Sequence, residues 1–168
     1  PRVRRQRQMC IRDSSYEAHV KYTNKNWFIG AKSVLGSNLT QASGLGGFGI
    51  KHIDNKTKEQ EYTPIRFSSS WLNVVYGQKW KPGIFVGYLK NLGTGKTIAG
   101  PTYGVGLEVD QVFTTNLQLS YNLPHWKLGV EYSPSLAWYG DMNAENGKIE
   151  NTHSVTNHRV LGVLIYMF

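Results

Sequence analysis

Apolar and polar residues alternate along the stretch from His125 to Tyr139. The apolar even positions are Trp126, Leu128, Val130, Tyr132, Leu136 and Trp138, and the odd positions include His125, Lys127, Glu131, Ser133 and Ser135. This period of two predicts a β-strand with one apolar and one polar face. The alternation outlasts the ~5 to 6 residues that are usual for a strand of a soluble protein. It suits a tilted membrane strand of ~9 to 11 residues that extends beyond the bilayer.

A Tyr, a short polar turn and a Trp follow one another three times along the chain. The copies pair Tyr22 with Trp27, Tyr76 with Trp80, and Tyr121 with Trp126. Each copy predicts a hairpin whose turn is bracketed by amphipathic rings, as in the aromatic girdle of a membrane barrel. Tyr and Trp favour strands in general, but three copies in the same relation to a turn favour the girdle. Together with the C-terminal pair, the predicted membrane-interface aromatics are Tyr22, Trp27, Tyr76, Trp80, Tyr121, Trp126, Tyr166 and Phe168.

The connections on the other side of these hairpins are long and rich in Gly, Asn, Lys and Thr. We predict seven strands near residues 16–23, 27–35, 62–76, 81–90, 103–121, 125–139 and 157–168, separated on this side by residues 36–61, 91–102 and 140–156. The first of these connections has room for a hairpin of its own at 45–53. Bacterial barrels have short periplasmic turns, long external loops and an even number of strands. The pattern therefore predicts an all-β fold, an antiparallel transmembrane β-barrel of which this chain is the C-terminal part, ending in the periplasm.

The basic charge is concentrated at the start of the chain. Residues 1–13 carry five Arg and one Asp, which is +4 of the formal net charge of +8 over 168 residues. This run resembles a translated sequencing adapter, and without interleaved aromatics it is a weak candidate for nucleic-acid binding. We therefore expect residues 1–13 to be a non-native or disordered leader, residues 14–168 to form the barrel part, and no nucleic acid to be a partner.

Other sequence motifs lack the context that their chemistry requires. Residues 44–49 match G-x-G-x-x-G, yet no strand–helix unit surrounds them, so a tight external hairpin is favoured. The five His residues have no zinc-site spacing, and no Ser, His and acid arrangement is visible. No continuous apolar stretch reaches the ~18 to 20 residues of a membrane helix. We expect no enzymatic activity, no metal and no cofactor.

The candidate functional residues are the charged ones at polar strand positions. They are His19, Lys21, Lys32, Lys127, Glu131 and Arg159. In a water-filled lumen, Lys and Arg raise the local anion concentration and set selectivity. The alternative is that they only keep the lumen hydrated.

The chain also resembles a known family along most of residues 16–168. The stretches WFIGAKSVLGSNL, SSSWLNVVYGQKWKPGIFVGYLKNLGTGK, NLPHWKLGVEYSPSLAWYG and NTHSVTNHRVLGVLIYMF resemble the C-terminal part of DcaP-like trimeric outer-membrane porins. The resemblance implies a barrel of about 16 strands in a homotrimer of the Gram-negative outer membrane, with dicarboxylate-like anions as solutes. It assigns no constriction residue to a position of this chain.

Three functional hypotheses follow from these patterns. The first is a passive outer-membrane channel for small hydrophilic, possibly anionic solutes, with outer-membrane lipid around it. The second is a non-conducting barrel that acts as an adhesin or structural anchor through its long external loops. The third is a soluble β-barrel with its apolar face turned inward around a lipophilic ligand.

Overall fold

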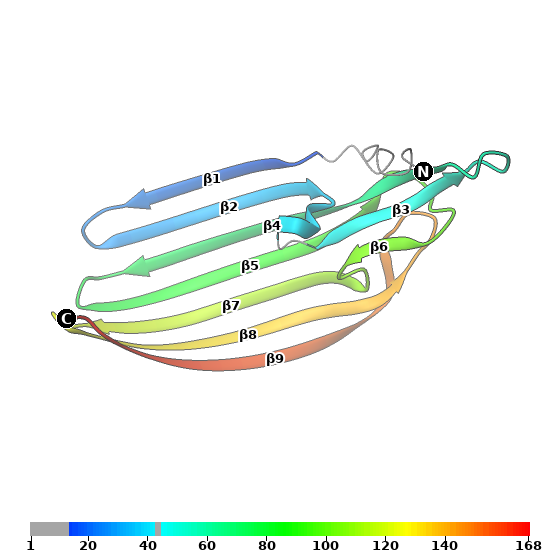
Figure 1. The fold of residues 1–168 in the computed structure, drawn as a ribbon. Coiled ribbons are helices and arrows are strands. Elements are labelled where there is room, and N and C mark those ends of the chain that lie inside the picture. Colours follow the sequence, from blue (N-terminus) through cyan, green and yellow to red (C-terminus); the bar gives the residue numbers. More distant parts are fainter. Residues whose placement is uncertain (1–13, 43–44) are drawn as a thin grey trace.

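The computed structural model describes residues 14–42 and 45–168, which form one antiparallel β-sheet of nine strands (Figure 1). The strands are β1 Tyr16–Thr23, β2 Trp27–Ser37, β3 Gly46–Ile53, β4 Gln60–Tyr76, β5 Trp80–Thr94, β6 Thr102–Val105, β7 Val109–Asn122, β8 Trp126–Met142 and β9 Ile149–Tyr166. A 3₁₀ turn, Leu39–Ala42, follows β2, and the described residues contain no α-helix. The all-β antiparallel class predicted from the sequence is confirmed.

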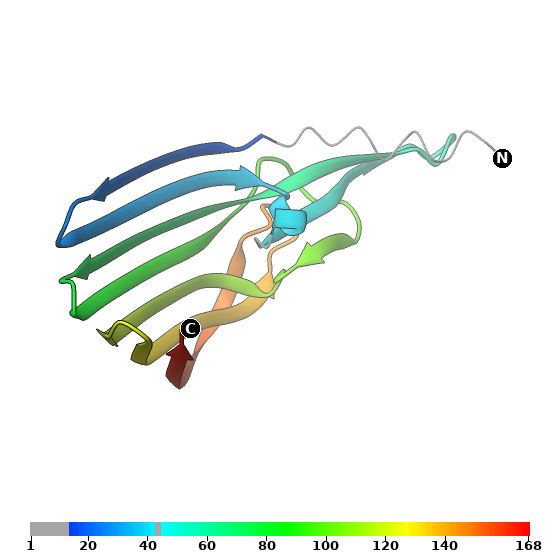
Figure 2. The same ribbon diagram turned by 60° about the vertical axis from the view of Figure 1, so that its left-hand side comes forward.

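Seven strands form the continuous sheet in the order β1-β2-β4-β5-β7-β8-β9. Within this path each strand pairs with the next one along the chain, once β3 and β6, which lie outside the path, are left out. β3 pairs with the first part of β4, and β6 pairs with β3. The sheet is curved but open, with β1 and β9 as its two edges (Figure 2).

The three short turns and the C-terminus lie at one end of the sheet, which we call the turn end; β3, β6 and the long connections lie at the other, the loop end (Figure 1). Backbone hydrogen bonds link each turn to the next hairpin. The Gly77 amide donates to the Asn26 carbonyl at 2.7 Å, and the Met167 amide donates to the His125 carbonyl at 2.8 Å. The predicted position of the C-terminus beside the short turns is confirmed.

The strand bounds correct three sequence-based expectations. The strand predicted at 103–121 is two strands, because Gly106 adopts a left-handed φ of 67° and a turn closes from its carbonyl to the Val109 amide. The predicted loops at 91–102 and 140–156 are shorter than expected, since β5 continues to Thr94 and β9 already starts at Ile149. Backbone pairing there persists through polar sequence that shows no apolar alternation. The expectation of a hairpin at 45–53 is wrong: residues 46–53 form the single strand β3, which makes a hairpin with the start of β4 through residues 54–59. The leader 1–13 lies outside the described residues.

Cross-strand register gives the sheet two chemically distinct faces. On the apolar face, apolar residues of paired strands lie directly opposite one another. Examples are Val20 and Ala31, Ile29 and Val74, Ile84 and Leu117, and Leu128 and Leu164. We call the other face the polar face. Every Lys, Arg and Glu in the strand parts of residues 16–35, 67–89, 112–139 and 153–166 lies on it, the short turns being left out. Most of the exposed large hydrophobic side chains of the structure belong to the apolar face.

Two pairs of polar side chains on the apolar face contact each other across neighbouring strands. The hydroxyls of Ser33 and Ser70 lie 2.9 Å apart across β2 and β4. The Tyr132 hydroxyl lies 2.8 Å from Nδ1 of His158, and their rings are stacked. Such mutual pairing lowers the cost of placing these groups in an apolar medium.

The buried apolar side chains are concentrated at the loop end. They are Ile50, Ile65, Phe67, Ile98, Val109 and Ile149, of which Ile50 and Ile65 are 1% exposed. Backbone bonds tie the connections around them, with the Ile98 amide donating to Ala144 and the Ala99 amide to Ile50. Gly49 packs against Ile98, and a Cβ at position 49 would lie only 3.1 Å from the Ile98 side chain. The long connections are therefore folded around a small core, which the sequence pattern did not predict.

Candidate functional site

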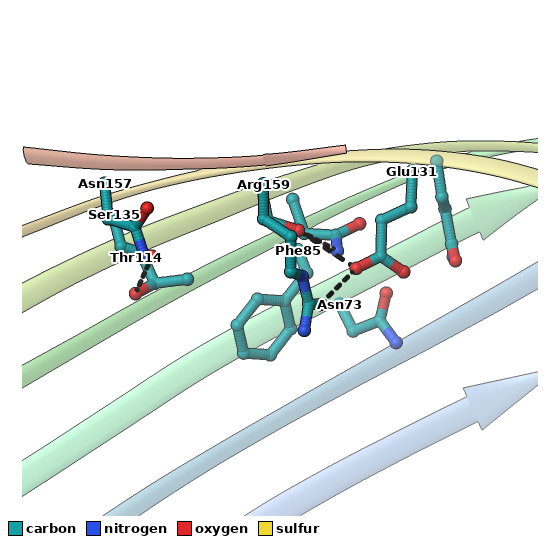
Figure 3. Close-up of a pocket in the computed structure, with 10 residues that line it drawn as sticks. Asn73, Phe85, Thr114, Glu131, Ser135, Asn157 and Arg159 are labelled. Carbon is teal, nitrogen blue, oxygen red and sulfur yellow. Dashed lines mark hydrogen bonds and ion pairs between the residues drawn. The ribbon is translucent and has the colours of Figure 1, made fainter. Parts of the chain in front are cut away.

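The polar face is hollowed into a pocket near the middle of the strands. Its volume is about 500 Å³, and it is lined by Asn73, Phe85, Thr114, Asn116, Gln118, Glu131, Ser133, Ser135, Asn157 and Arg159. These residues come from β4, β5, β7, β8 and β9, so five adjacent strands curve around one hollow. Figure 3 shows the labelled side chains projecting to the same side of the sheet.

A chain of hydrogen bonds crosses the floor of this pocket from β7 to β9. Asn116 Nδ2 donates to Ser133 Oγ at 2.9 Å, and Ser133 Oγ donates to Glu131 Oε1 at 2.9 Å. The same carboxylate oxygen accepts from Nη2 of Arg159 at 2.7 Å. Charge-assisted bonds of this kind fix the geometry of both partners. The pocket therefore contains one cation and one anion, held against each other.

The remaining lining groups are amides and hydroxyls. Thr114 Oγ1 donates to Ser135 Oγ at 3.0 Å. Among the described residues, Asn73 Oδ1 is a buried side-chain oxygen without a hydrogen-bond partner. A buried acceptor left unpaired costs roughly 1 to 3 kcal/mol, so this oxygen would gain from a donor that enters the pocket.

Phe85 is the aromatic wall of the pocket, and glycines give it room. On the polar face of β5 it is flanked by Gly83 and Gly87. A Cβ at Gly87 would lie 3.0 Å from the Phe85 ring, and one at Gly83 would lie 2.5 Å from the Gln118 amide. The ring of Trp71 lies beyond, with its centroid 6.1 Å from that of Phe85. Larger residues at 83 and 87 would displace Gln118 and the Phe85 ring.

The structure places all six sequence-predicted polar residues on the polar face, but it does not gather them into one site. Glu131 and Arg159 meet in the pocket. Lys32 pairs with Glu17 at 2.8 Å, and His19 lies 3.5 Å from the same carboxylate, so these two belong to a separate group on β1 and β2. Lys21 lies over the Phe28 ring at 5.8 Å. Lys127 lines another hollow, nearer the turn end.

The predicted interface aromatics form a row along the turn end of the apolar face. The contacts join neighbouring hairpins: Trp27 packs on Tyr76, Trp80 on Tyr121 and Trp126 on Tyr166, with ring centroids 4.5–4.7 Å apart. Phe168 continues the row, 5.7 Å from Tyr166. Tyr22, on the edge strand β1, is 53% exposed. The predicted hairpins are confirmed, and the cross-hairpin partners are a feature that only the register shows.

Sequence reasoning missed most of the uncharged pocket lining. Asn73, Phe85 and Asn116 were not singled out, because a single amide or ring on a strand carries no signal by itself. An available signal was the run Gly83-Ile-Phe-Val-Gly87, in which a large aromatic residue stands between two glycines at a spacing of two. Glu17, the partner of Lys32, was also missed.

At the loop end, two carboxyl groups have lowered pKa values: Asp54, in the turn between β3 and β4, and Glu61, near the start of β4. The pKa of Asp54 is lowered because the backbone amides of Thr57 and Lys56 donate to its carboxylate. The pKa of Glu61 is lowered by its hydrogen bond with Lys51, whose Nζ lies 2.8 Å away. These groups are exposed and present a charged surface on the outer part of the β3–β4 hairpin.

Comparison with known proteins identifies no relative. No protein-family profile, no curated protein and no solved structure matches this chain. Over residues 14–42 and 45–168, the structure brings together no group of three or more His, Cys, Asp or Glu that could hold a metal ion. Within the same ranges no helix is long and apolar enough to span a bilayer.

Proposed function

We propose that this chain is part of an outer-membrane channel through which small hydrophilic solutes, anions among them, diffuse passively. The observation that carries the proposal is the segregation of the two faces: charge on one, exposed apolar side chains on the other, and a row of Trp–Tyr contacts along one end. Membrane barrels have this arrangement, with an apolar band of about 25 Å bounded by aromatic rings at the interfaces.

The exposed apolar face needs an apolar surrounding. Leu117, Val130 and Leu164 are 51%, 51% and 63% exposed. An apolar patch that covers seven strands is far larger than a soluble monomer tolerates. Lipid is a suitable surrounding for this face, because its Ser33–Ser70 and Tyr132–His158 groups are hydrogen-bonded to each other and its aromatic row lies at one end.

The polar face supplies the wall of an aqueous path. Along the stretches where the faces are segregated, it carries five cationic side chains, Lys21, Lys32, Lys81, Lys127 and Arg159, against two anionic ones, Glu17 and Glu131. A surplus of positive charge in a confined lumen attracts anions. This surplus favours anionic, dicarboxylate-like solutes over cations.

A channel requires more strands than these seven. In lipid, every backbone amide and carbonyl must be hydrogen-bonded, so an open sheet has to close into a barrel. β1 and β9 run in the same direction, because six antiparallel steps separate them. An antiparallel barrel therefore needs an odd number of further strands between these edges. A barrel of about 16 strands in a homotrimer, as the family resemblance implies, meets this condition.

Single-channel recording in planar bilayers tests the proposal. The sample is the protein purified from the outer membrane of a Gram-negative host, with any strands that its full reading frame adds to these seven. We expect discrete current steps, and a reversal potential in a salt gradient that shows anion preference. Lys21→Glu with Lys127→Glu should reduce that preference, whereas Lys25→Glu, in an exposed turn, should leave it nearly unchanged. Absence of any conductance from folded, membrane-inserted protein would refute the channel.

The folded loop end supports a second candidate function, a non-conducting barrel that binds a ligand outside the cell. Ile50, Ile98 and Ile149 fix the connections in one arrangement, as a recognition surface requires. Cells displaying the protein would then adhere to a host or matrix surface, and removal of residues 54–59 at the hairpin tip would abolish adhesion. If adhesion does not depend on this tip, this candidate is rejected.

A further inference from the structure

We propose that the pocket on the polar face is a binding site for neutral polyhydroxylated solutes of the size of a mono- or disaccharide. The inference rests on the proposed channel and adds a solute class at one point of its wall. Its starting observation is the chemistry of the lining: four carboxamides, three hydroxyls, one phenyl ring and one closed ion pair.

The closed ion pair makes the pocket electrically neutral. Arg159 donates to Glu131 at 2.7 Å, and Ser133 donates to the same carboxylate oxygen. An anion that binds the remaining N–H donors of Arg159 would lie beside the Glu131 carboxylate and be repelled by its negative charge. A cation that binds Glu131 would be repelled by Arg159 in the same way. Neutral solutes avoid both costs, even though the wall as a whole is positively charged.

The uncharged lining matches hydroxyl groups. Carboxamides and hydroxyls both donate and accept hydrogen bonds, as sugar hydroxyls do. Asn73, Asn116, Gln118 and Asn157 lie around the hollow on three different strands, β4, β7 and β9, so a multivalent ligand can contact several at once. Asn73 Oδ1 is without a partner, which leaves an acceptor for a ligand hydroxyl.

The ring of Phe85 supplies the apolar surface that the C–H face of a sugar ring packs against. The ring lies over Gly87 and the Gln118 side chain lies over Gly83, where a Cβ would be 3.0 Å and 2.5 Å from them, so the two glycines allow both groups to lie along the pocket wall. The volume of about 500 Å³ falls within the range of about 300 to 1,000 Å³ that is common for small-molecule pockets.

Saturation-transfer NMR on the folded protein, with every strand needed for closure, tests the site in a detergent without a sugar headgroup and with maltose, glycine and succinate as probes. We expect saturable binding of maltose and no saturable binding of the other two. Phe85→Ala and Asn116→Ala should each weaken maltose binding about tenfold. Phe28→Ala, which removes a ring from the same face outside the pocket, should leave it unchanged. Circular dichroism confirms that each variant retains the wild-type strand content.

A second variant tests the neutrality argument. Glu131→Gln frees Arg159, so we expect succinate binding to appear in this variant. The proposal is overturned if the wild-type chain binds succinate or glycine more tightly than maltose, or if maltose binding survives both Phe85→Ala and Asn116→Ala. Maltose binding without conductance would refute the channel and leave the site standing. Conductance without maltose binding would refute the site alone.

Discussion

An arginine placed on the apolar face should be far more costly than one placed on the polar face at the same depth. Leu117 and Gln118 are adjacent on the central strand β7 and point to opposite faces, opposite Tyr132 and Glu131 respectively. Leu117→Arg and Gln118→Arg therefore add the same charge at the same height. Leu117 is 51% exposed, so the substitution creates no large cavity in the protein itself.

The expected cost follows from the position of Leu117 relative to the aromatic row. It lies four residues from Tyr121, and at a rise of about 3.4 Å per residue and a tilt of about 45° this is about 9 to 10 Å. In an apolar band of about 25 Å, Leu117 is thus within about 3 Å of the middle. Arginine there costs roughly 2 to 4 kcal/mol in a membrane barrel, a factor of about 30 to 700 in the folding equilibrium. Gln118→Arg adds a cation beside Glu131 and should cost less than about 1 kcal/mol.

Urea unfolding in lipid vesicles, followed by tryptophan fluorescence, measures the difference between the two variants. The sample is again the protein with every strand needed for closure, so that the unfolding transition reports on an inserted barrel. Equal costs for Leu117→Arg and Gln118→Arg would refute the assignment of the apolar face to lipid. A larger cost for Gln118→Arg would favour the soluble barrel with its apolar face turned inward.

Three further predictions address the turn end, the aromatic row and the loop end. Gly77→Ala should destabilise the second hairpin by about 1 to 3 kcal/mol. Gly77 has a φ of 102°, and a Cβ there would lie 2.1 Å from the Trp80 carbonyl oxygen. The unfolding midpoint measures this loss of stability, and a neutral effect would contradict the turn geometry. A double-mutant cycle with Trp80→Ala and Tyr121→Ala should give a coupling of about 0.5 to 1.5 kcal/mol from their 4.5 Å contact, and additive effects would exclude the pairing. The lowered pKa of Asp54 means that its turn gains stability above the ordinary pKa of 3.8 and loses it as the pH falls through the lower, folded value. The protection factor of the Thr57 amide, which is the intrinsic exchange rate at each pH divided by the observed one, should therefore fall on going from about pH 5 to about pH 2, and Asp54→Ala should show the low protection at every pH.

The period-two pattern was sufficient to predict the strands whose two faces differ. β8 and the three hairpins around Trp27, Trp80 and Trp126 lie where alternation and turn chemistry placed them. The pattern was insufficient where both faces of a strand become polar, as in the last residues of β5 and the first of β9. There the strand is maintained by backbone pairing to its neighbours, which leaves no periodic trace in the side chains.

The candidate site could be predicted only in part for the same reason. Charge made Glu131 and Arg159 visible in the sequence, but their meeting depends on the register between β8 and β9, in which Ser133 faces Arg159. The uncharged pocket lining comes from five strands, and Asn73 and Asn157 are brought near one hollow only by the curvature of the sheet. Local sequence carries no information on that curvature.

The aromatic row also bears on how such a sheet is assembled. Each hairpin presents a Trp on one side and a Tyr on the other, and the Trp of one fits the Tyr of the next. The contact is head-to-tail, like the heterologous interface of an open filament, and a further hairpin could always be added. Tyr22, on the edge strand β1, is exposed, and the Trp of a further hairpin could pack on it. These ring contacts join neighbouring hairpins but do not limit their number, so the circumference of the proposed barrel would have to be determined by something other than the row itself.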